Sequence, residues 1–428
     1  MTEQPILPNS YLYARRGETN VEGYEFEPIR GYPMLQWKGK RPFTSTQFYP
    51  AQLREVYGEP VEDWRNKIYW GDNLQVMGHL LKNYRGCIKL IYIDPPFDSK
   101  ADYKKKIQVR GKTISNDISG FEDKQYTDIW NNDAYLQYMY ERLILLRELL
   151  TDDGAIYLHT GYQSSHLLRV LLDEVFGVSN FINEIIWQKI RVVKAQSLAF
   201  GNVHDSIYIY SKSPKKNFHP QYRDQERDYQ LKFDKIEQET GRRYQLVSLV
   251  QAGAGPDRWF RGKLLSPGVD RHWIWSQDRI DKALEEGLIE FTSNGTPRKK
   301  QYLDESQGKA VDDLWTDIFP VNSQATEDTK YPTQKPEALL ERIIAASSNP
   351  NDIVLDCFMG SGTTQAVALK LGRRFIGADI NIGAIQTTTK RLMNIAHEIQ
   401  EEQSQPQLGS EEPVTYYTGF EVYNVNHY

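Results

Sequence analysis

The sequence has few of the residues that stabilise small extracellular domains. It contains two cysteines, Cys87 and Cys357, and eight histidines among its 428 residues. Two cysteines form neither a disulfide framework nor a zinc site by themselves, so we expect no metal and a reducing, cytoplasmic compartment. The stretch from Met1 to Arg16 lacks the apolar segment of a secretory signal. No apolar run approaches the roughly 20 residues that span a bilayer, which excludes a membrane protein.

The sequence also lacks a strong overall charge, since its net charge is −5. The charge is unevenly distributed, however. Residues 185–303 contain 21 Lys and Arg and 14 Asp and Glu, a net charge of +7, whereas the remainder carries −12. A basic segment in an acidic chain is typical of a surface that faces a polyanion such as DNA. An ordinary solvated surface is the alternative that the charge alone leaves open.

The hydrophobic pattern predicts two blocks of alternating strands and helices. The first block has expected strands at 68–70, 87–93, 155–159, 182–188 and 206–210, with helices at 133–150 and 164–176. The second has expected helices at 336–346, 362–371 and 382–399, with strands at 353–358 and 375–378. Apolar strands separated by helices predict a mostly parallel sheet that is covered on both faces. Neither block completes such a sheet, so we expect one doubly wound α/β sheet built from both.

The remaining segments complete the expected domain organisation. We expect an irregular arm at 1–60, the first half of the sheet domain at 61–212, an insertion at 213–303, the second half at 304–399, and a linker with a C-terminal strand at 400–428. The polar stretch 98–132 is expected to be a long loop. Within the insertion, Trp259, Trp273 and Trp275 are expected to form a small local core.

A glycine-containing loop follows one expected strand of the second block. The run from Asp356 to Gly362 ends this strand and opens a helix, and Asp379 follows 23 residues after Asp356, at the end of the next strand. Glycines let a ligand approach the backbone at the carboxyl edge of a sheet, where a carboxylate in the place of Asp379 binds ribose hydroxyls. The loop differs from the dinucleotide pattern, which favours a nucleoside without phosphates. An ordinary strand–helix turn is the alternative.

Asp94, Pro95, Pro96 and Phe97 follow an expected buried strand of the first block. The two prolines make the backbone rigid, and Phe97 presents a flat face beside a carboxylate. Asp94 and the Pro95 carbonyl can accept both hydrogens of an exocyclic amine while Phe97 stacks on the ring. Such an amine is a poor nucleophile because its lone pair is conjugated into the ring. Two acceptors favour a pyramidal nitrogen whose lone pair is free to attack. The alternative is that the two prolines merely end the strand and that Asp94 caps the backbone there.

With these two motifs, the sequence resembles the amino-methyltransferases that move a methyl group from S-adenosylmethionine to adenine N6 or cytosine N4 in DNA. In that family, Asp-Pro-Pro followed by Tyr or Phe is catalytic, and a Phe-x-Gly-x-Gly loop holds the cofactor. The catalytic motif comes first here, as in the beta class, with target recognition between the two motifs. The likeness is greatest to modification subunits of type III restriction systems. Other stretches that carry it are 67–73, 128–130, 181–187, 331–336 and 377–379.

The resemblance implies a Rossmann-like, doubly wound, mostly parallel sheet with a circularly permuted motif order and an inserted target-recognition region. It implies S-adenosylmethionine as the cofactor and catalytic roles for Asp94, Pro95, Pro96 and Phe97. The residues that it assigns to the cofactor are Asp72, Thr333, Lys335, Asp356, Phe358, Gly360, Gly362 and Asp379.

Within this set the resemblance also implies individual roles. Asp379 would bind the ribose and Asp72 the adenine edge, while Thr333 and Lys335 would contact the methionine part. Tyr331 stands where a histidine is frequent in the family, and we assign it no role.

We therefore expect an enzyme that methylates adenine N6 of a base flipped out of double-stranded DNA, because the cytosine enzymes more often have Ser at the position of Asp94. A cytosine-N4 methyltransferase and a catalytically silent DNA-binding subunit are the alternatives. A restriction subunit and a second copy of the chain are protein partners that the resemblance leaves open. The residues expected to contact DNA are Lys104, Lys105, Arg223, Arg242, Arg243 and Arg258.

Overall fold

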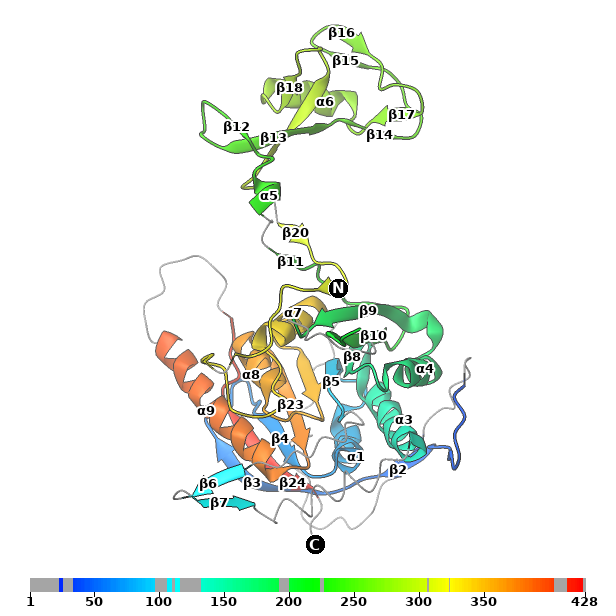
Figure 1. Cartoon of the computed structure of the whole chain (residues 1–428), viewed down its shortest axis with the longest axis vertical. Helices are drawn as coiled ribbons and strands as arrows, with labels where there is room; N and C mark the ends of the chain where they lie inside the picture. Colours follow the sequence, from blue (N-terminus) through cyan, green and yellow to red (C-terminus); the bar gives the residue numbers. More distant parts are fainter. Residues whose placement is uncertain are drawn as a thin grey trace. The chain divides into compact units, whose positions relative to one another are not determined.

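The computed structural model of the chain contains two compact units, which are drawn in Figure 1. It describes residues 23–25, 34–96, 106–109, 112–115, 132–191, 200–223, 227–305, 308–322, 324–403 and 414–425. The first unit comprises Met1–His219 and Asp312–Tyr428, and the second is Pro220–Val311. The second unit begins and ends later than the expected insertion at 213–303, because β11 (Tyr222–Arg223) pairs with β20 (Lys309–Ala310).

One sheet of ten strands forms the centre of the first unit, in the order β21-β9-β10-β8-β5-β22-β23-β4-β24-β3. The first-block strands are β4 (Asn66–Trp70), β5 (Ile88–Ile93), β8 (Leu150–Thr160), β9 (Phe181–Gln188) and β10 (His204–Ser211). The later strands are β21 (Leu314–Trp315), β22 (Ile353–Asp356), β23 (Arg374–Asp379) and β24 (Phe420–Val425). Strand β22 lies parallel between β5 and β23, so strands of both blocks are neighbours. The expected doubly wound sheet built from both blocks is confirmed.

Helices cover both faces of this sheet. Contacts join α1 (Asn73–Tyr84), α3 (Asn132–Leu149) and α4 (Ser165–Phe176) on one face, and α7 (Glu337–Ser347), α8 (Thr363–Lys370) and α9 (Ile382–Gln403) on the other. The apolar repeat of α3 explains its packing, because Met139, Leu143 and Leu146 are fully buried. Strand β5 is buried at five of its six positions, as expected for a strand covered on both faces. No helix within the described ranges is long and apolar enough to cross a membrane.

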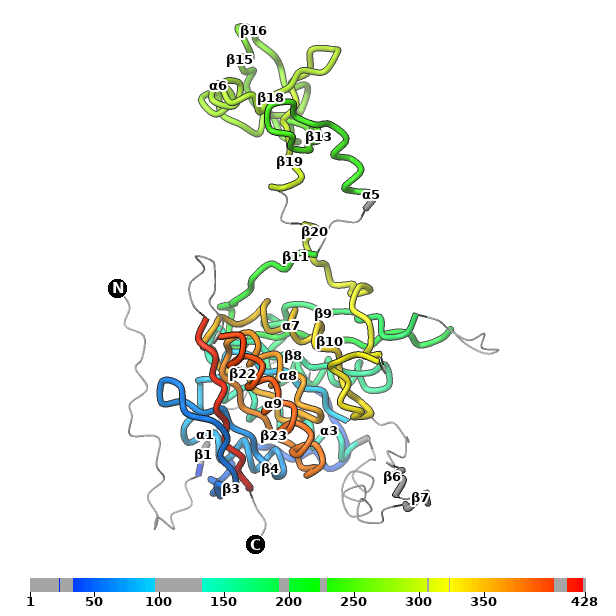
Figure 2. Tube along the Cα trace, turned by 90° about the vertical axis from the view of Figure 1, so that its left-hand side faces the viewer, coloured from blue at the N-terminus to red at the C-terminus, as the bar shows by residue number. Residues whose placement is uncertain are grey.

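The two ends of the chain extend the sheet beyond β4. Strand β3 (Ala51–Tyr57) pairs antiparallel with β24, and β24 pairs parallel with β4. Figure 2 shows the C-terminal strand beside these early segments. The expected C-terminal strand is confirmed, but the irregular arm predicted for residues 1–60 is wrong where β3 forms. Most residues of β3 are exposed, so it has no apolar period that the sequence could display.

Two further short pairs of strands depart from the expectations. Strand β1 (Gly23–Glu25) pairs with β2 (Ser45–Gln47), again within the expected irregular arm. The hairpin of β6 (Lys106–Val109) and β7 (Lys112–Ser115) lies within the expected loop 98–132, so that expectation is wrong there.

The second unit has a core of its own. Its antiparallel sheet contains β12 (Lys235–Ile236), β13 (Arg243–Ser248), β19 (Pro297–Tyr302) and β18 (Ile289–Phe291). The remaining elements are α5 (Arg227–Gln230), α6 (Gln277–Glu285), β14 (Val250–Ala252) with β17 (Arg271–Trp273), and β15 (Arg258–Phe260) with β16 (Lys263–Leu265). Phe260 and Trp275 are buried in the apolar core, and Trp273 packs against it. The expected local core is right for these two tryptophans and wrong for Trp259, which is 53% exposed.

A buried row of polar side chains crosses four neighbouring strands of the central sheet. The Tyr92 hydroxyl on β5 lies 2.8 Å from His159 Nδ1 on β8. His159 Nε2 lies 3.2 Å from Asp205 Oδ2 on β10, and Lys189 Nζ, after β9, donates to Asp205 Oδ1 at 2.7 Å. Tyr92, His159 and Asp205 are each at most 2% exposed. Burial raises the pKa of Asp205, but its contacts with His159 and Lys189 outweigh burial and leave that pKa below the usual 3.8.

Asp205→Asn should therefore destabilise the protein at neutral pH. We expect the free energy of unfolding to fall by about 1.5–3 kcal/mol, the range for a hydrogen bond to a charged group. A lowered carboxyl pKa stabilises the fold above the unfolded-state pKa, and this contribution disappears as the pH falls through the folded-state pKa. The difference from wild type should thus shrink below the usual aspartate value of 3.8. Urea unfolding across pH measures this. Asp152→Asn, on an exposed residue of the same β8, is the control; an equal loss in both variants contradicts the prediction.

Candidate active site

Three acidic residues meet at the carboxyl edge of the central sheet. Asp356 ends β22, Asp379 ends β23, and Asp94 directly follows β5. The three strands are parallel neighbours, with Leu355 opposite Ile91 and Asp356 opposite Gly377. Their carboxyl ends therefore lie side by side, and the sheet itself brings together the two motifs that the sequence separates by more than 250 residues.

Asp379 shapes the glycine loop by accepting two backbone hydrogen bonds. The Gly360 N–H donates to Asp379 Oδ2 at 2.9 Å, and the Asn381 N–H donates to Oδ1 at 2.8 Å. Gly360 and Gly362 both have left-handed backbone angles, with φ of 50° and 72°. The loop thus has the conformation that favours glycine, and its backbone faces the end of β23 at hydrogen-bonding distance.

Asp356 supports the same loop from inside the protein. Its Oδ1 accepts the Phe358 N–H at 2.9 Å and its Oδ2 accepts the Thr364 hydroxyl at 2.6 Å, while the residue is only 3% exposed. Burial raises the pKa of Asp356 to about 7, and the nearby charges of Asp94 and Asp379 act in the same direction. Asp356 is buried and both of its oxygens are used within the loop, whereas Asp379 is only half-buried, so Asp356 acts here as a support of the loop.

Asp72 joins the start of α1 to α3. Its Oδ1 accepts the Leu74 N–H at 2.9 Å, which caps α1, and its Oδ2 lies 3.0 Å from a terminal nitrogen of Arg142. Arg142 also donates to Asn73, whose amide donates to the Cys357 carbonyl at 3.1 Å. The Asp72 side chain remains 37% exposed. This hydrogen-bond network therefore connects the accessible Asp72 carboxylate to Cys357, the residue before Phe358.

Asp94 has two unlike carboxylate oxygens. Its Oδ2 accepts a hydrogen bond from the Lys335 ammonium. Its Oδ1 is buried and has no hydrogen-bond partner among the described residues. Pro95 is buried behind it and Pro96 is half-buried, whereas Phe97 lies outside the described residues. A buried acceptor without a donor suits a ligand that carries an N–H group.

The two residues expected at the methionine end differ in their surroundings. Thr333 is exposed. The side chain of Lys335 is only 15% exposed and forms an ion pair with Asp94. Lys335 was expected at the cofactor, and its contact with the catalytic motif was not foreseen, because nothing in the sequence links positions 241 residues apart.

The carboxylates at this edge of the sheet suit the polar groups of S-adenosylmethionine. That molecule carries a sulfonium, an α-ammonium and a ribose diol, and each of these groups is stabilised by carboxylates. Asp72, Asp94 and Asp379 supply carboxylates near a loop that admits close backbone approach. Within the described ranges, no group of three or more His, Cys, Asp or Glu side chains could hold a metal ion.

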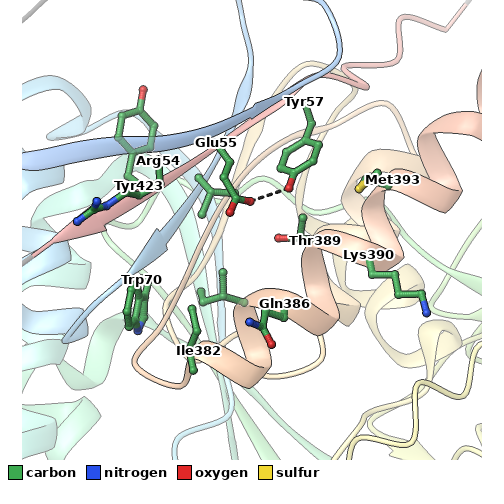
Figure 3. A pocket seen from close by; sticks show the side chains of 12 residues that line it. Arg54, Glu55, Tyr57, Trp70, Ile382, Gln386, Thr389, Lys390, Met393 and Tyr423 are labelled. Carbon is green, nitrogen blue, oxygen red and sulfur yellow. Dashed lines mark hydrogen bonds between the residues drawn. The ribbon is translucent and has the colours of Figure 1, made fainter.

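A separate hollow of about 530 Å³ lies between α9 and the strands β3, β4 and β24, and Figure 3 shows the side chains that line it. Trp70, Tyr57 and Tyr423 contribute aromatic rings, and the Tyr57 hydroxyl donates to Glu55 at 2.6 Å. None of the residues expected to bind the cofactor or the base lines it. Its lining residue Trp70 is paired with Asp379 across β4 and β23, so the hollow borders the acidic edge.

The residues expected to contact DNA have diverse environments. Arg242 pairs with Asp304 and Glu305, both at 2.7 Å. Arg243 donates to the Phe233 carbonyl at 3.1 Å. Arg258 lies half-buried on β15 and Arg223 half-buried on β11, and Lys104 and Lys105 are outside the described residues. Internal partners thus hold Arg242 and Arg243, while the role of the whole set stays a prediction.

Sequence reasoning gave no role to several residues that shape the site. The Arg142 guanidinium pairs with Asp72. The Thr364 hydroxyl donates to Asp356, and the Thr388 hydroxyl donates to the Gly360 carbonyl. Arg142 had a signal, because it lies three residues after Met139 and so on the same face of the expected helix as the apolar repeat. A charged side chain at such a position indicates a buried partner.

Gly362→Ala should destabilise the protein more than a comparable glycine change. A Cβ at Gly362 would lie 2.5 Å from Thr388 side-chain atoms and would require a left-handed φ of 72°. Gly86→Ala is the matched control, since Gly86 has φ of 69° and nothing within 4 Å of its Cβ position. We expect about 1–2 kcal/mol of strain in both variants and roughly 1–3 kcal/mol more for Gly362→Ala from overpacking. Equal losses in chemical denaturation contradict a tightly packed loop.

Comparison with known proteins identifies the family of the chain. The family described as DNA methylase, which covers N6 and N4 methylation, matches residues 88–390. The type II methyltransferase M.EcaI of Enterobacter cloacae is 33% identical over 330 residues, which cover 76% of this chain and 69% of that protein. The StyLTI Mod subunit, a type III restriction-modification enzyme of Salmonella typhimurium, is 26% identical over 72% of this chain. This chain spans about half the length of that relative, 50%.

The comparison with solved structures also gives a match. The M1.HpyAVI complex with S-adenosylmethionine covers 76% of this chain and 98% of its own, with 18% identity and a TM-score of 0.39. The family match extends from β5, which precedes the catalytic motif, through the glycine loop into α9. The chain belongs to the DNA methylase family that methylates adenine N6 or cytosine N4, and S-adenosylmethionine is the cofactor of that family.

Proposed function

We propose that this chain transfers a methyl group from S-adenosylmethionine to adenine N6 of a base flipped out of double-stranded DNA. The observation that carries the proposal is the state of Asp94 at the carboxyl end of β5. One of its oxygens is held by Lys335, and the other is buried without a partner. That second oxygen offers a preorganised acceptor for an amine hydrogen.

The proposed cofactor site lies beside this acceptor, at the ends of β22 and β23. When bound, S-adenosylmethionine supplies an electrophilic methyl group on a sulfonium. Asp379 accepts from the ribose hydroxyls, and Asp72 accepts from the adenine edge. The backbone at Gly360 admits close approach, while the buried Asp356 holds the loop in shape.

In the proposed reaction, the chain orients the amine. Asp94 Oδ1 accepts one amine hydrogen and the Pro95 carbonyl accepts the other, so the nitrogen becomes pyramidal and its lone pair points toward the methyl group. The methyl transfer would be a direct displacement, in which the N–C bond would form as the S–C bond of the cofactor breaks, with no covalent bond to the enzyme. Asp94 takes the proton that the nitrogen loses and returns it to solvent. Alignment and fixed acceptors supply most of the acceleration.

Adenine is proposed over cytosine because of the carboxylate at position 94. In the family that the sequence resembles, cytosine-N4 enzymes more often have Ser at this point of the motif. Both bases present an exocyclic amine, so the chemistry at Asp94 serves either of them. Identification of the product therefore decides between adenine-N6 and cytosine-N4 transfer.

For DNA contact, we propose the β15–β16 hairpin of the second unit. Its turn residues Arg261 and Gly262 both have positive φ, as in a type I′ turn. Phe260 points into the core, which leaves Trp259 and its cross-strand partner Leu264 exposed at 53% and 49%. Cations flank this pair at Arg258 and Lys263. Cations can neutralise phosphates and an exposed aromatic ring can contact bases.

A restriction subunit is a proposed protein partner. The StyLTI relative is named as the Mod subunit of a restriction-modification enzyme, and this chain matches about half of it, 50%. Assembly with a second copy of the chain also stays a prediction.

The proposed activity predicts a defined product. Purified protein with labelled S-adenosylmethionine should place label on N6-methyladenine in digested DNA. Asp94→Ala should lower kcat by about 10²–10³-fold, the cost of losing one preorganised group at the reacting centre, with little change in cofactor affinity. Recovery of N4-methylcytosine alone favours the cytosine alternative. Absence of any methylated base with wild-type protein favours a silent DNA-binding subunit.

The proposed hairpin predicts a change in the salt dependence of DNA binding. Replacing Arg258 and Lys263 together with Ala should reduce the slope of log affinity against log salt by about 2, because each phosphate contact contributes about 0.9. Lys282→Ala, which removes an exposed α6 lysine paired with Glu286, should leave the slope unchanged. Fluorescence anisotropy between 50 and 200 mM salt, the range typical of such titrations, measures it. A wild-type slope in the double variant moves the DNA contact elsewhere.

A further inference from the structure

We propose that Lys335 is a positioning residue for methyl transfer: it holds one oxygen of the Asp94 carboxylate and so turns the other oxygen to the amine. The inference rests on the proposed function and deepens it. It differs from the role that the family resemblance implies, in which Lys335 contacts the methionine part of the cofactor.

The contact that carries the proposal joins two well-anchored groups. The Lys335 ammonium donates to Asp94 Oδ2, and the two side chains are 15% and 18% exposed. The Lys335 carbonyl accepts the Thr363 hydroxyl at 3.2 Å, and Arg391 donates to the same hydroxyl at 3.0 Å. Pro336, the next residue, is buried just before α7. The backbone of Lys335 is therefore fixed, and this fixes the point from which its side chain reaches Asp94.

The anchor of Lys335 also links it to the glycine loop. Thr363 is the first residue of α8 and directly follows Gly362. The same backbone that shapes the cofactor loop thus sets the distance between Lys335 and Asp94. A displacement of the loop would be transmitted to the catalytic carboxylate through a single side chain.

The Lys335 ammonium also brings positive charge to an edge that is crowded with carboxyl groups. Asp94 shares the carboxyl edge with Asp356 and Asp379, and these three carboxyls are close enough that Asp94 and Asp379 raise the pKa of Asp356. Tyr92 faces the same region, and burial together with Asp94 and Asp356 raises its pKa, so it stays neutral. His159 stands level with Asp94 on β8, since Ile93 is opposite Leu158, and it bonds to Tyr92 and Asp205.

Among the described residues, Lys335 is the cation that forms an ion pair with Asp94. Without it, no cation would fix which oxygen of the Asp94 carboxylate faces the base. The ammonium also occupies Oδ2, so the unpaired Oδ1 is the oxygen that remains for the base.

The test removes the charge while keeping the length of the side chain. Lys335→Met should lower kcat by about 10–100-fold, the usual cost of losing a partner that orients a reactive group. Lys335→Arg, which keeps a cation, should restore much of the wild-type kcat. The affinity for S-adenosylmethionine, measured by calorimetry, should change less than about twofold.

Controls separate positioning from folding and from cofactor binding. Lys370→Met removes a lysine of α8 that pairs with Glu337 at 2.7 Å, and it should leave kcat near the wild-type value. Lys335→Gln replaces the Met variant if the latter does not fold. A wild-type kcat together with a large loss of cofactor affinity overturns the proposal and returns Lys335 to the cofactor.

A readout without catalysis separates this inference from the proposed function. The carboxyl-carbon chemical shift of Asp94, followed by NMR in protein labelled at aspartate and identified by its absence in Asp94→Asn, should change in Lys335→Met and stay unchanged in Lys370→Met. An unchanged chemical shift in Lys335→Met overturns the inference. If wild-type protein methylates no DNA but the chemical shift changes, the proposed function is wrong and the Lys335–Asp94 contact stands.

Discussion

The crowding of carboxylates at one edge of a parallel sheet is the constraint on which the site depends. Parallel strands end at the same edge, so Asp94, Asp356 and Asp379 come together once β5, β22 and β23 are neighbours. Like charges repel, and each carboxyl is satisfied in a different way. Asp379 accepts backbone N–H groups, Asp356 is buried with a raised pKa, and Asp94 pairs with Lys335.

These different solutions give the three acids different roles. A carboxyl whose two oxygens are used inside a loop, as in Asp356, supports the backbone that a cofactor approaches. A carboxylate with one oxygen held and the other bare, as in Asp94, is ready to accept a new donor. The same sheet edge therefore has one carboxyl that supports a loop and one that keeps an unpaired acceptor oxygen, and the difference arises from hydrogen-bond partners rather than from residue type.

Much of the fold could be predicted because its signals are local. The apolar run of β5 and the leucine repeat of α3 are visible in short windows of sequence, and the glycine loop identifies the start of α8. Strand β3 could not be predicted, since its exposed residues have no period and its order comes from pairing with β24. The antiparallel direction of β10 likewise follows from its neighbours and not from its composition.

The site was predictable in its residue types and not in its pairings. Motif spacing indicated Asp94 and Asp379, but the Lys335–Asp94 contact joins positions 241 residues apart and depends on how α7 is set against β5. Charge counting had the same weakness in the second unit, where it treated all arginines alike. Arg242 is held by two acids, whereas Trp259 is exposed beside cations. Net charge indicates that a segment faces a polyanion, but only the pairing of each cation shows which side chains are free to do so.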